Sequence, residues 1–261
     1  MCNLLQVSKS GYYKYLQTDS QISTNDSLCL SKVKQYRNIQ PYVGTYKCWK
    51  MLDNDGLKIG RNHLNCLLKD QNMLIKKKKK FCNTSLSDGS KVYPNLLKNT
   101  EVKRKNQVWV TDITYISKDK GFYYLFLLSD MYTRQILDYE VSSNMLTDNH
   151  IMMLKRQLNY VNNTNDLIHH SDHGSQYTSN ETINLLKKHG VKISMTGDGK
   201  CYDNPIAERI NCTMKHEFGL KRTFSTIESL KKATKDAVMI YNSQRLHKSL
   251  GYFTPNDFAN H

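Results

Sequence analysis

Between residues 106 and 196 the sequence changes from three successive strand-like segments to alternating helical and strand-like ones, and this change constrains the fold most. The first three segments are rich in Val, Ile, Tyr, Phe and Thr and follow one another at hairpin spacing, which is typical of an antiparallel meander. An antiparallel meander followed by alternating helices and strands predicts a mixed sheet covered by helices, which is an α/β fold. The predicted segments are 106–116, 121–133 and 134–143 for the meander, and 147–161, 166–170, 179–190 and 191–196 for the alternation, with Thr147 or Asp148 capping the first helix.

Helical patterns flank this region on both sides. Residues 25–74 carry apolar residues three and four apart, interrupted by turn signals such as Gly56 and Gly60. Short helices joined by tight turns are typical of a small all-α helix-turn-helix-like module, although an ordinary helical bundle gives the same pattern. Two further helical segments, 204–218 and 225–247, complete the pattern at the C-terminal side.

A run of five lysines follows the helical module and begins with Lys76, Lys77 and Lys78. A block of like charge cannot pack in a core, so it suits either contact with phosphate groups or a solvated linker. Weak periodicity after the run favours a linker. The predicted parts are a helical module at 1–75, a basic linker at 76–104, an α/β core at 105–220 and a C-terminal helix and tail at 221–261.

The net charge of the chain is +15, with a sequence pI near 9.4, which indicates a polyanionic partner. Nucleic acid is favoured over an anionic membrane. The longest apolar stretch, within 121–132, is far shorter than the roughly 20 residues that cross a bilayer. The first residues lack the unbroken apolar core of a signal peptide, and seven scattered cysteines without a Cys-x-x-Cys pair favour reduced thiols, so we expect a cytoplasmic protein associated with the nucleoid.

Asp112 lies in the middle of the first predicted strand. The two-residue period places Val108, Val110 and Ile116 on its face of the strand. Burying an unpaired carboxylate costs several kcal/mol, so a cation or a hydrogen-bond partner is expected beside it. An aspartate at a frayed strand end is the simpler alternative.

Asp172 occurs in the stretch HHSDHGSQYTS, at the carboxyl end of the strand 166–170, where ligand-binding residues of α/β sheets gather. Three interpretations compete: a histidine metal cluster, a helix cap, and one corner of a carboxylate site. A zinc hydrolase of the His-x-His-x-Asp-His type needs a histidine at the position of Ile168, which disfavours the cluster. We expect His169 and His170 to be strand-end residues that hold Asp172, and 174–179 to form the turn into the next helix.

Glu208 lies in the first turn of a helix that Asn204 is expected to cap, with proline at the first helical position. Asn204, Glu208, Asn211 and Lys215 follow at steps of four, three and four residues and form one polar stripe. A favourable interaction of Glu208 with the helix dipole, worth under about 1 kcal/mol, is the simpler role for this residue. The adjoining apolar face consists of Ile206, Ile210, Met214 and Phe218.

The motifs WVTDITYI, HHSDHGSQYTS and CYDNPIAERINCTMKHE together resemble the DDE core of retroviral-integrase-like transposases. In particular they resemble the second-frame (OrfB) protein of the IS-three group of bacterial insertion sequences. The 35 residues between Asp172 and Glu208 match the spacing of that family, and Lys215 lies seven residues after Glu208, where the family carries a basic residue. The resemblance covers nearly the whole chain. Its departures are mild: Pro205 replaces a small residue, and His173 replaces other polar residues.

The resemblance implies a ribonuclease-H-like fold in which Asp112, Asp172 and Glu208 are catalytic and ligate two Mg²⁺ ions, with Mn²⁺ able to substitute. It implies that water cleaves DNA at an element end to free a 3′-hydroxyl, which then attacks a second phosphodiester. Lys215 would contact a phosphate near the terminal bases, unless it is an ordinary exposed helix lysine. Asn204 is a further predicted DNA contact.

The partners implied are double-stranded DNA, as terminal inverted repeats and as target, and an upstream-frame OrfA-type protein or a fusion with it. Joining two element ends also favours a homo-oligomer on DNA. Two other functions remain open: a DNA-binding regulator of transposition that does not cleave, and a structure-specific ribonuclease-H-like nuclease. The presence of all three acids favours the transposase, and the basic helical module disfavours the nuclease.

Overall fold

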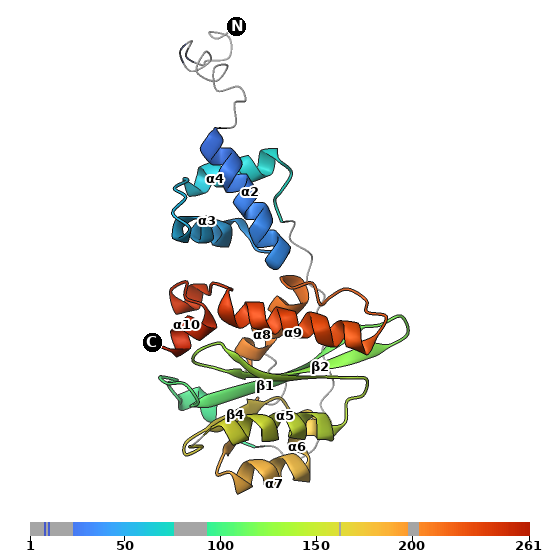
Figure 1. Cartoon of the computed structure of the whole chain (residues 1–261). Helices are drawn as coiled ribbons and strands as arrows, with labels where there is room; N and C mark the ends of the chain where they lie inside the picture. The colour runs from blue at the N-terminus through green and yellow to red at the C-terminus, as the bar shows by residue number, and fades with distance from the viewer. Residues whose placement is uncertain (1–7, 9, 11–22, 76–92, 162, 198–203) are drawn as a thin grey trace. The chain divides into compact units, whose positions relative to one another are not determined.

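The computed structural model describes residue 8, residue 10 and the ranges 23–75, 93–161, 163–197 and 204–261 (Figure 1). The lysines at 76–78 lie outside these ranges. The chain divides into two compact units, which we describe separately. The smaller unit is Met1–Ile39 with Val43–Lys76, and the larger unit is Gln40–Tyr42 with Lys77–His261.

Within residues 23–75, the smaller unit contains three helices, as predicted for residues 25–74. They are α2 (Thr24–Ile39), α3 (Thr45–Asn54) and α4 (Arg61–Asp70). Gly56, at φ +79°, follows α3 in the left-handed region that glycine adopts without strain. The apolar stripes of the three helices meet in one core, which includes Cys29, Val33, Cys48, Leu52, Leu64 and Leu68.

The larger unit is built on a five-stranded mixed sheet with the order β3-β2-β1-β4-β5. The first three strands form the predicted antiparallel meander, and β4 and β5 run parallel to β1. The β1–β2 turn contains Gly121 at φ +93°. The strands are β1 (Val108–Ser117), β2 (Phe122–Asp130), β3 (Ile136–Ser142), β4 (Ile168–Ser171) and β5 (Lys192–Met195).

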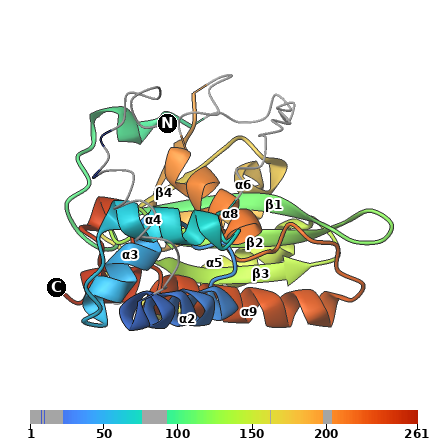
Figure 2. The same ribbon diagram turned by 90° about the horizontal axis from the view of Figure 1, so that it is seen from above.

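Helices cover both faces of the sheet (Figure 1). One face packs against α5 (Thr147–Tyr160), α6 (Ser175–Thr178) and α7 (Asn180–Lys188). The other packs against α8 (Pro205–His216) and α9 (Ile227–Ser243). In Figure 2, α9 runs along β3. The described part of the unit also has short helices at η1 (Leu96–Asn99), η3 (Lys248–Leu250) and α10 (Pro255–Ala259).

The two cores follow from the alternation of side chains along β1. Trp109 points into the core shared with α5 and α7, whereas Ile116 points into the core shared with α8 and α9. Both residues are essentially inaccessible to solvent. The period-2 assignment of Asp112 to the face of Val108, Val110 and Ile116 therefore places it on the α8 side of the sheet.

Several local predictions need correction. Helix α5 begins after Leu146, and neither Thr147 nor Asp148 caps it. Helix α9 ends at Ser243, four residues earlier than predicted. Part of the predicted linker packs on the core, since the backbone N–H of Leu96 donates to Ser194 Oγ at 3.0 Å.

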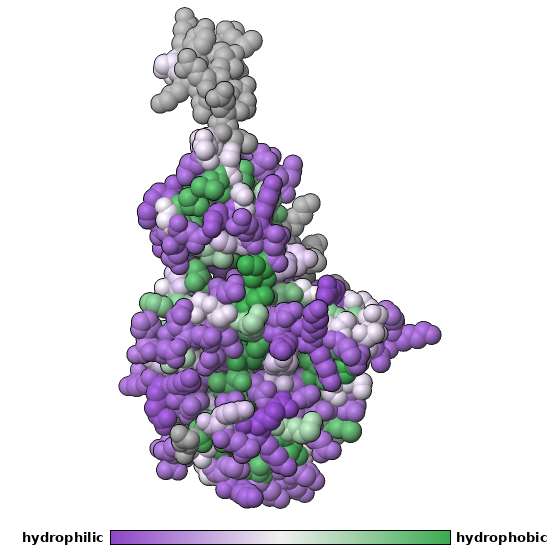
Figure 3. Space-filling view, viewed as in Figure 1, coloured by the Kyte–Doolittle hydropathy of each residue, from purple (hydrophilic) through white to green (hydrophobic). Residues whose placement is uncertain are grey.

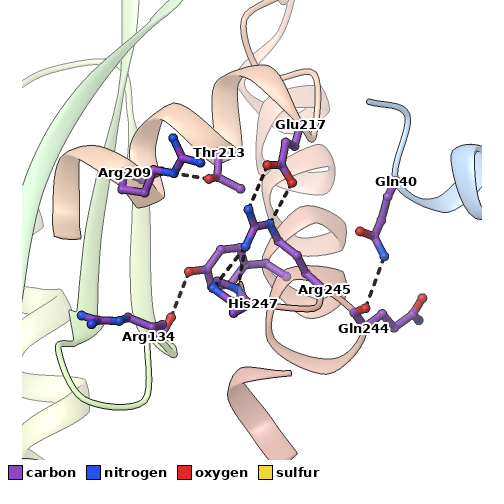
Figure 4. A network of polar contacts seen from close by, with 9 residues as sticks. Gln40, Arg134, Arg209, Thr213, Glu217, Gln244, Arg245 and His247 are labelled. Carbon is purple, nitrogen blue, oxygen red and sulfur yellow. Dashed lines mark hydrogen bonds and ion pairs between the residues drawn. The ribbon is translucent and has the colours of Figure 1, made fainter. Parts of the chain in front are cut away.

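The chain after α9 is fastened to the core by buried polar contacts (Figure 4). Arg245, only 5% exposed, donates from Nε and Nη2 to the two carboxylate oxygens of Glu217, each at 2.8 Å. The phenol of Tyr241 donates to the carbonyl oxygen of Arg134 at 3.0 Å. Because Glu217 directly follows α8, the Arg245–Glu217 pair connects the C-terminal segment to the helix that carries Glu208, whereas the Tyr241 bond holds α9 itself to the turn between β2 and β3.

Within the described ranges, the structure contains no helix with the length and apolar character needed to cross a bilayer.

Candidate active site

Asp112 and Asp172 lie level with each other on neighbouring strands. Strand β1 pairs with β4 in parallel, with Val108 opposite Ile168 and Val110 opposite His170. The same register, continued by two residues, places Asp172 beside Asp112. Neighbouring strands lie about 4.8 Å apart. The two aspartates therefore lie close together, at the place where β4 ends and β1 continues.

Helix α8 brings Glu208 to this point because two asparagines attach the helix to β1. Asn204 Nδ2 donates to the carbonyl oxygen of Thr111 at 3.1 Å, and Asn211 Nδ2 donates to Asp112 Oδ2 at 2.6 Å. Glu208 lies between these two attachments on the same stripe of the helix. Glu208 is exposed to solvent.

The expected capping role of Asn204 needs correction. It occupies the N-cap position of α8, but its side chain makes no capping hydrogen bond, because the amide is committed to β1. Only 6% of Asn204 is exposed, and its predicted contact with DNA stays a prediction. Its function is to anchor α8 to the sheet.

The electrostatics of Asp112 reflect the proximity of the other two acids. Burial, together with the charges of Asp172 and Glu208, raises the pKa of Asp112 to about 7. The hydrogen bonds from Asn211 and from the backbone N–H of Ile113 oppose this rise. Asp172 and Glu208 thus both act on the charge of Asp112, which is the kind of charge pattern that a divalent cation can neutralise.

The two aspartates are held in fixed orientations. Asp112 Oδ1 accepts a hydrogen bond from Ile113 N at 2.9 Å, while Asn211 holds its other oxygen. Asp172 Oδ1 accepts from Gly174 N, also at 2.9 Å. A Cβ at Gly174 would lie 3.1 Å from that same oxygen, so glycine lets the chain turn closely around the carboxylate.

Lys215 lies two turns along α8 from Glu208 and is half-buried. Burial lowers the pKa of its ammonium group below its ordinary range, and the Asp112 carboxylate acts in the opposite direction. This interaction places the lysine on the side of α8 that faces the acids. Lys215 is therefore positioned to add a positive charge beside them.

The described residues include no group of three or more His, Cys, Asp or Glu side chains already gathered closely enough to hold a metal ion. Asp172 and Glu208 each lie within electrostatic range of Asp112, but the described side chains are not gathered around a shared centre. Two buried acceptors beside them, Asn204 Oδ1 and Asn211 Oδ1, have no hydrogen-bond partner. Carboxylates with nearby amide oxygens fit a hydrated Mg²⁺ ion, which prefers oxygen ligands and retains several waters.

The histidines of HHSDHGSQYTS contribute to packing. The buried ring of His169 lies 5.5 Å from the ring of His150 and 6.5 Å from that of Tyr177, measured between centroids. Its Nε2 has no hydrogen-bond partner, and its expected role in holding Asp172 stays a prediction. His170 Nδ1 lies 2.9 Å from Ser194 Oγ and connects β4 to β5. Because burial also lowers the pKa of His169 to about 3, this ring stays neutral near pH 7.

We expect Asp112→Asn to stabilise the protein at pH 8 in metal-free buffer. A pKa of about 7 in the folded chain, against about 4 unfolded, means that Asp112 opposes folding increasingly as pH rises from 4 to 7. The free energy of unfolding of the variant should be higher than that of the wild type by roughly 1–3 kcal/mol at pH 8 in EDTA. At pH 5 the difference should be smaller. Urea unfolding at both pH values measures this; an equal difference at the two pH values would contradict it.

Asn211 is the site residue whose role the sequence did not reveal. The stripe pattern places it next to Glu208, but helical spacing does not show what a side chain contacts on another element. The way in which α8 packs against β1 decides that Asn211 contacts Asp112.

The comparisons with known proteins agree with this geometry. The family described as integrase core domain matches residues 102–201, and a second family of that description matches residues 189–255. Over 264 residues the chain is 34% identical to the insertion element IS600 uncharacterized 31 kDa protein of Shigella sonnei, covering 99% of this chain and 97% of that protein. It is 29% identical to transposase InsF for insertion sequence IS3A of Escherichia coli K12, covering 100% and 93% respectively.

A solved structure resembles the chain in fold. It is the simian T-cell lymphotropic virus intasome in complex with PP2A regulatory subunit B56 gamma, with a TM-score of 0.51 at 14% identity. The match covers 81% of this chain and 74% of that one. This likeness confirms the predicted α/β ribonuclease-H-like architecture of an integrase core with additional helices.

Proposed function

The chain belongs to the integrase-core transposases of bacterial insertion sequences, in the IS-three group, and from this premise we propose that Asp112, Asp172 and Glu208 are its catalytic acids. The observation that carries the proposal is the meeting of β1, the end of β4 and α8, where Asn211 donates to Asp112 at 2.6 Å and the charges of Asp172 and Glu208 act on Asp112. The reaction proposed is hydrolysis at the element end followed by transfer of the freed 3′-hydroxyl to a second phosphodiester.

We propose that the same three acids hold two Mg²⁺ ions, with Mn²⁺ as a substitute. Such a pair, when bound, activates the attacking oxygen and stabilises the leaving oxygen of an in-line displacement. The chain's own contribution is to orient the ligands. Asn211 and the Ile113 amide fix Asp112, and the Gly174 amide fixes Asp172. No nucleophilic side chain is required, because the nucleophile is water in the first step and the 3′-hydroxyl in the second.

Lys215 is proposed to contact a phosphate of the terminal nucleotides. The ammonium group would neutralise part of the charge that a DNA strand brings to a pocket already rich in carboxylates. Its partial burial supports this role, because a half-buried ammonium group gains more from a phosphate than a fully hydrated one does.

The helical unit is proposed to bind element-end DNA through α4. Its exposed surface carries Arg61, Asn62, Asn65 and Lys69, of which Arg61, Asn65 and Lys69 recur at every fourth position. An arginine side chain can form two hydrogen bonds with the edge of a guanine base, and an asparagine side chain can do the same with adenine. Helix α4 follows α3 across a short turn, as a recognition helix does.

Asn65→Ala is expected to lower affinity for element-end DNA by about 5- to 100-fold, since one base contact contributes about 1–3 kcal/mol. Affinity for an unrelated duplex should change little. Asn38→Ala, an equally exposed asparagine on α2, is the matched control and should bind both duplexes normally. Fluorescence anisotropy at fixed salt measures all three proteins. Equal losses on both duplexes would contradict sequence readout by α4.

DNA is the partner that a transposase requires. We propose further that the DNA is the terminal inverted repeats and the target, that an upstream-frame OrfA-type protein or a fusion with it cooperates, and that at least two copies of the chain act together on two ends.

The deciding experiment incubates the protein with element-end oligonucleotides and either MgCl₂ or EDTA, and resolves the products on a denaturing gel. Magnesium-dependent nicking and strand-transfer products support the proposal. DNA binding without nicking under any divalent cation would instead support the alternative, a regulator of transposition that does not cleave.

A further inference from the structure

A row of cations on the larger unit begins beside Asp112 and ends at the β1–β2 hairpin. It consists of Lys215 at the end of α8, Lys221 and Arg222 in the segment after α8, and Lys118 in the turn of the hairpin, and we call it the basic track. Lys221 and Arg222 are exposed, whereas Lys118 and Lys215 are partly exposed.

The segment after α8 runs alongside the outer half of β1. At its start, α8 is attached to Asp112 by Asn211 at 2.6 Å. At its end, the backbone N–H of Phe224 donates to the carbonyl oxygen of Ser117 at 3.0 Å, and Phe224 pairs with Lys118 in a parallel bridge. Ser117 is five residues beyond Asp112, so the segment follows about 17 Å of the strand. In Figures 1 and 2 it reaches the hairpin turn.

The basic track lies on the same side of the sheet as Asp112. Arg222 Cζ lies 4.7 Å from the centroid of the Phe224 ring, and Lys118 Nζ lies 5.1 Å from that of the Tyr123 ring. Both rings are buried in the core between the sheet and helices α8 and α9. Asp112 accepts its hydrogen bond from α8 and so faces the same way. The two ring contacts also restrict the cations, which lowers the entropy cost of ordering them on a ligand.

Lys215 joins the basic track to the acids. The backbone N–H of Lys221 donates to the carbonyl oxygen of Lys215 at 3.1 Å. Burial lowers the pKa of the Lys215 ammonium group, the Asp112 carboxylate acts to raise it, and the ammonium group of Lys221 acts to lower it. Lys215 therefore interacts with an acid of the site on one side and with the next cation of the track on the other.

The positive charge of the basic track is not balanced by neighbouring acids. In the ranges that the structure describes, none of the four cations forms an ion pair with a carboxylate. Glu217, which lies between Lys215 and Lys221 in the sequence, is bound to Arg245. In the hairpin turn, exposed Asp119 is followed by exposed Lys120, so the turn keeps the charge of Lys118. A continuous row of uncompensated cations attracts a polyanion.

The length of the basic track suits a DNA strand. From Asp112 to Lys118 the strand advances six residues, about 20 Å, which corresponds to about six nucleotide steps of one DNA strand. On the face drawn in Figure 3, the hairpin turn projects from the larger unit as a hydrophilic tip.

We propose that the basic track binds the phosphate backbone of the element-end duplex over the roughly six nucleotides next to the reacting phosphodiester. This inference rests on the proposed function and extends the single contact proposed for Lys215 to a continuous surface. Because the track continues from the lysine assigned to the terminal nucleotides, it follows the same DNA. Contacts of this kind carry no sequence information and fix the direction in which the duplex leaves the acids.

The test uses the full chain in EDTA, so that no cleavage occurs. Fluorescence anisotropy of a labelled element-end duplex over a series of KCl concentrations gives the slope of log Kd against log[KCl]. The principal variant is Lys221→Gln/Arg222→Gln. Since Arg222 packs on a core ring, Lys118→Gln provides an independent variant. The matched control is Lys187→Gln/Lys188→Gln, two exposed lysines on α7, which covers the opposite face of the sheet.

The slope is expected to fall by about 2 for the double variant and by about 1 for Lys118→Gln, because each lost phosphate contact removes about 0.9. The control should keep the wild-type slope. Neutral methylphosphonates in place of the phosphates within about six steps of the reacting one should lower the slope of the wild type. They should leave that of the double variant nearly unchanged, since its contacts are already lost.

Equal slopes for the wild type, the double variant and Lys118→Gln would overturn the inference. So would equal slopes combined with a higher target-DNA concentration for half-maximal strand transfer, which would assign the basic track to target DNA. A protein that shows the expected slopes but cleaves no DNA with any divalent cation would overturn the proposed function and still support the basic track.

Discussion

Asp172→Asn is expected to reduce nicking and strand transfer by about 10³-fold or more while leaving DNA binding within about twofold. The substitution preserves shape, and an asparagine oxygen can still accept the hydrogen bond from Gly174 N. It removes the negative charge that a divalent cation requires from a ligand at this point. Gel assays with magnesium, together with anisotropy in EDTA, measure the two quantities separately.

Asp166→Asn provides the control for Asp172→Asn. Asp166 precedes β4 and bonds to Lys192 at 2.6 Å in an exposed ion pair, whereas Asp172 follows the same strand. Exposed ion pairs contribute little to the stability of a protein, so this variant should fold normally. It should therefore retain full activity. Equal activity of Asp172→Asn and Asp166→Asn would refute the assignment of Asp172 to the site.

Arg245→Met is expected to lower the free energy of unfolding by about 3–5 kcal/mol, because it leaves the Glu217 carboxylate in a largely buried position without its partner. Arg245 also donates to the ring of His247 and lies over the ring of Tyr241, 5.5 Å from its centroid. For a chain of this length the loss corresponds to a fall in melting temperature of about 10 °C. Thermal and urea unfolding followed by circular dichroism measure it.

Arg156→Met separates the effect of burial from that of pairing. Arg156 also bridges two carboxylates, Asp138 at 2.9 Å and Glu140 at 2.8 Å, but 43% of its side chain is exposed. Its replacement should cost under about 1 kcal/mol. Adding Glu217→Gln to Arg245→Met should recover part of the lost stability, because the carboxylate charge that faces Arg245 in the wild type is then absent. Equal losses for Arg245→Met and Arg156→Met would contradict the account.

The sequence predicted the elements that have a regular period. The strands of the meander and helices α5, α7 and α8 were found because their apolar residues recur at two or at three to four positions. The position of Asp112 on the α8 side of β1 followed from the same rule. The 35-residue gap before Glu208 was informative through resemblance to a family, not through physical derivation.

Tertiary contacts decided what the sequence did not reveal. Asn204 is a strong capping residue in isolation, yet its side chain bonds to the backbone of β1, 93 positions away in the chain. Helix α10 is too short for a periodic signal and is held by packing on α9. The burial of His150 and His169 against Tyr177 depends on α5 lying over β4, which local pattern does not specify.

The central claim is that Asp112, Asp172 and Glu208 together hold divalent cations, and direct measurement of Mn²⁺ binding tests it without reference to activity. Electron paramagnetic resonance of free Mn²⁺ gives the number of ions bound per chain. We expect two bound Mn²⁺ ions per chain for the wild type on element-end DNA, and fewer than one for Asp172→Asn and for Glu208→Gln. Asp166→Asn should bind as many ions as the wild type. Equal Mn²⁺ binding by the wild type and by a variant lacking all three carboxylates would contradict it.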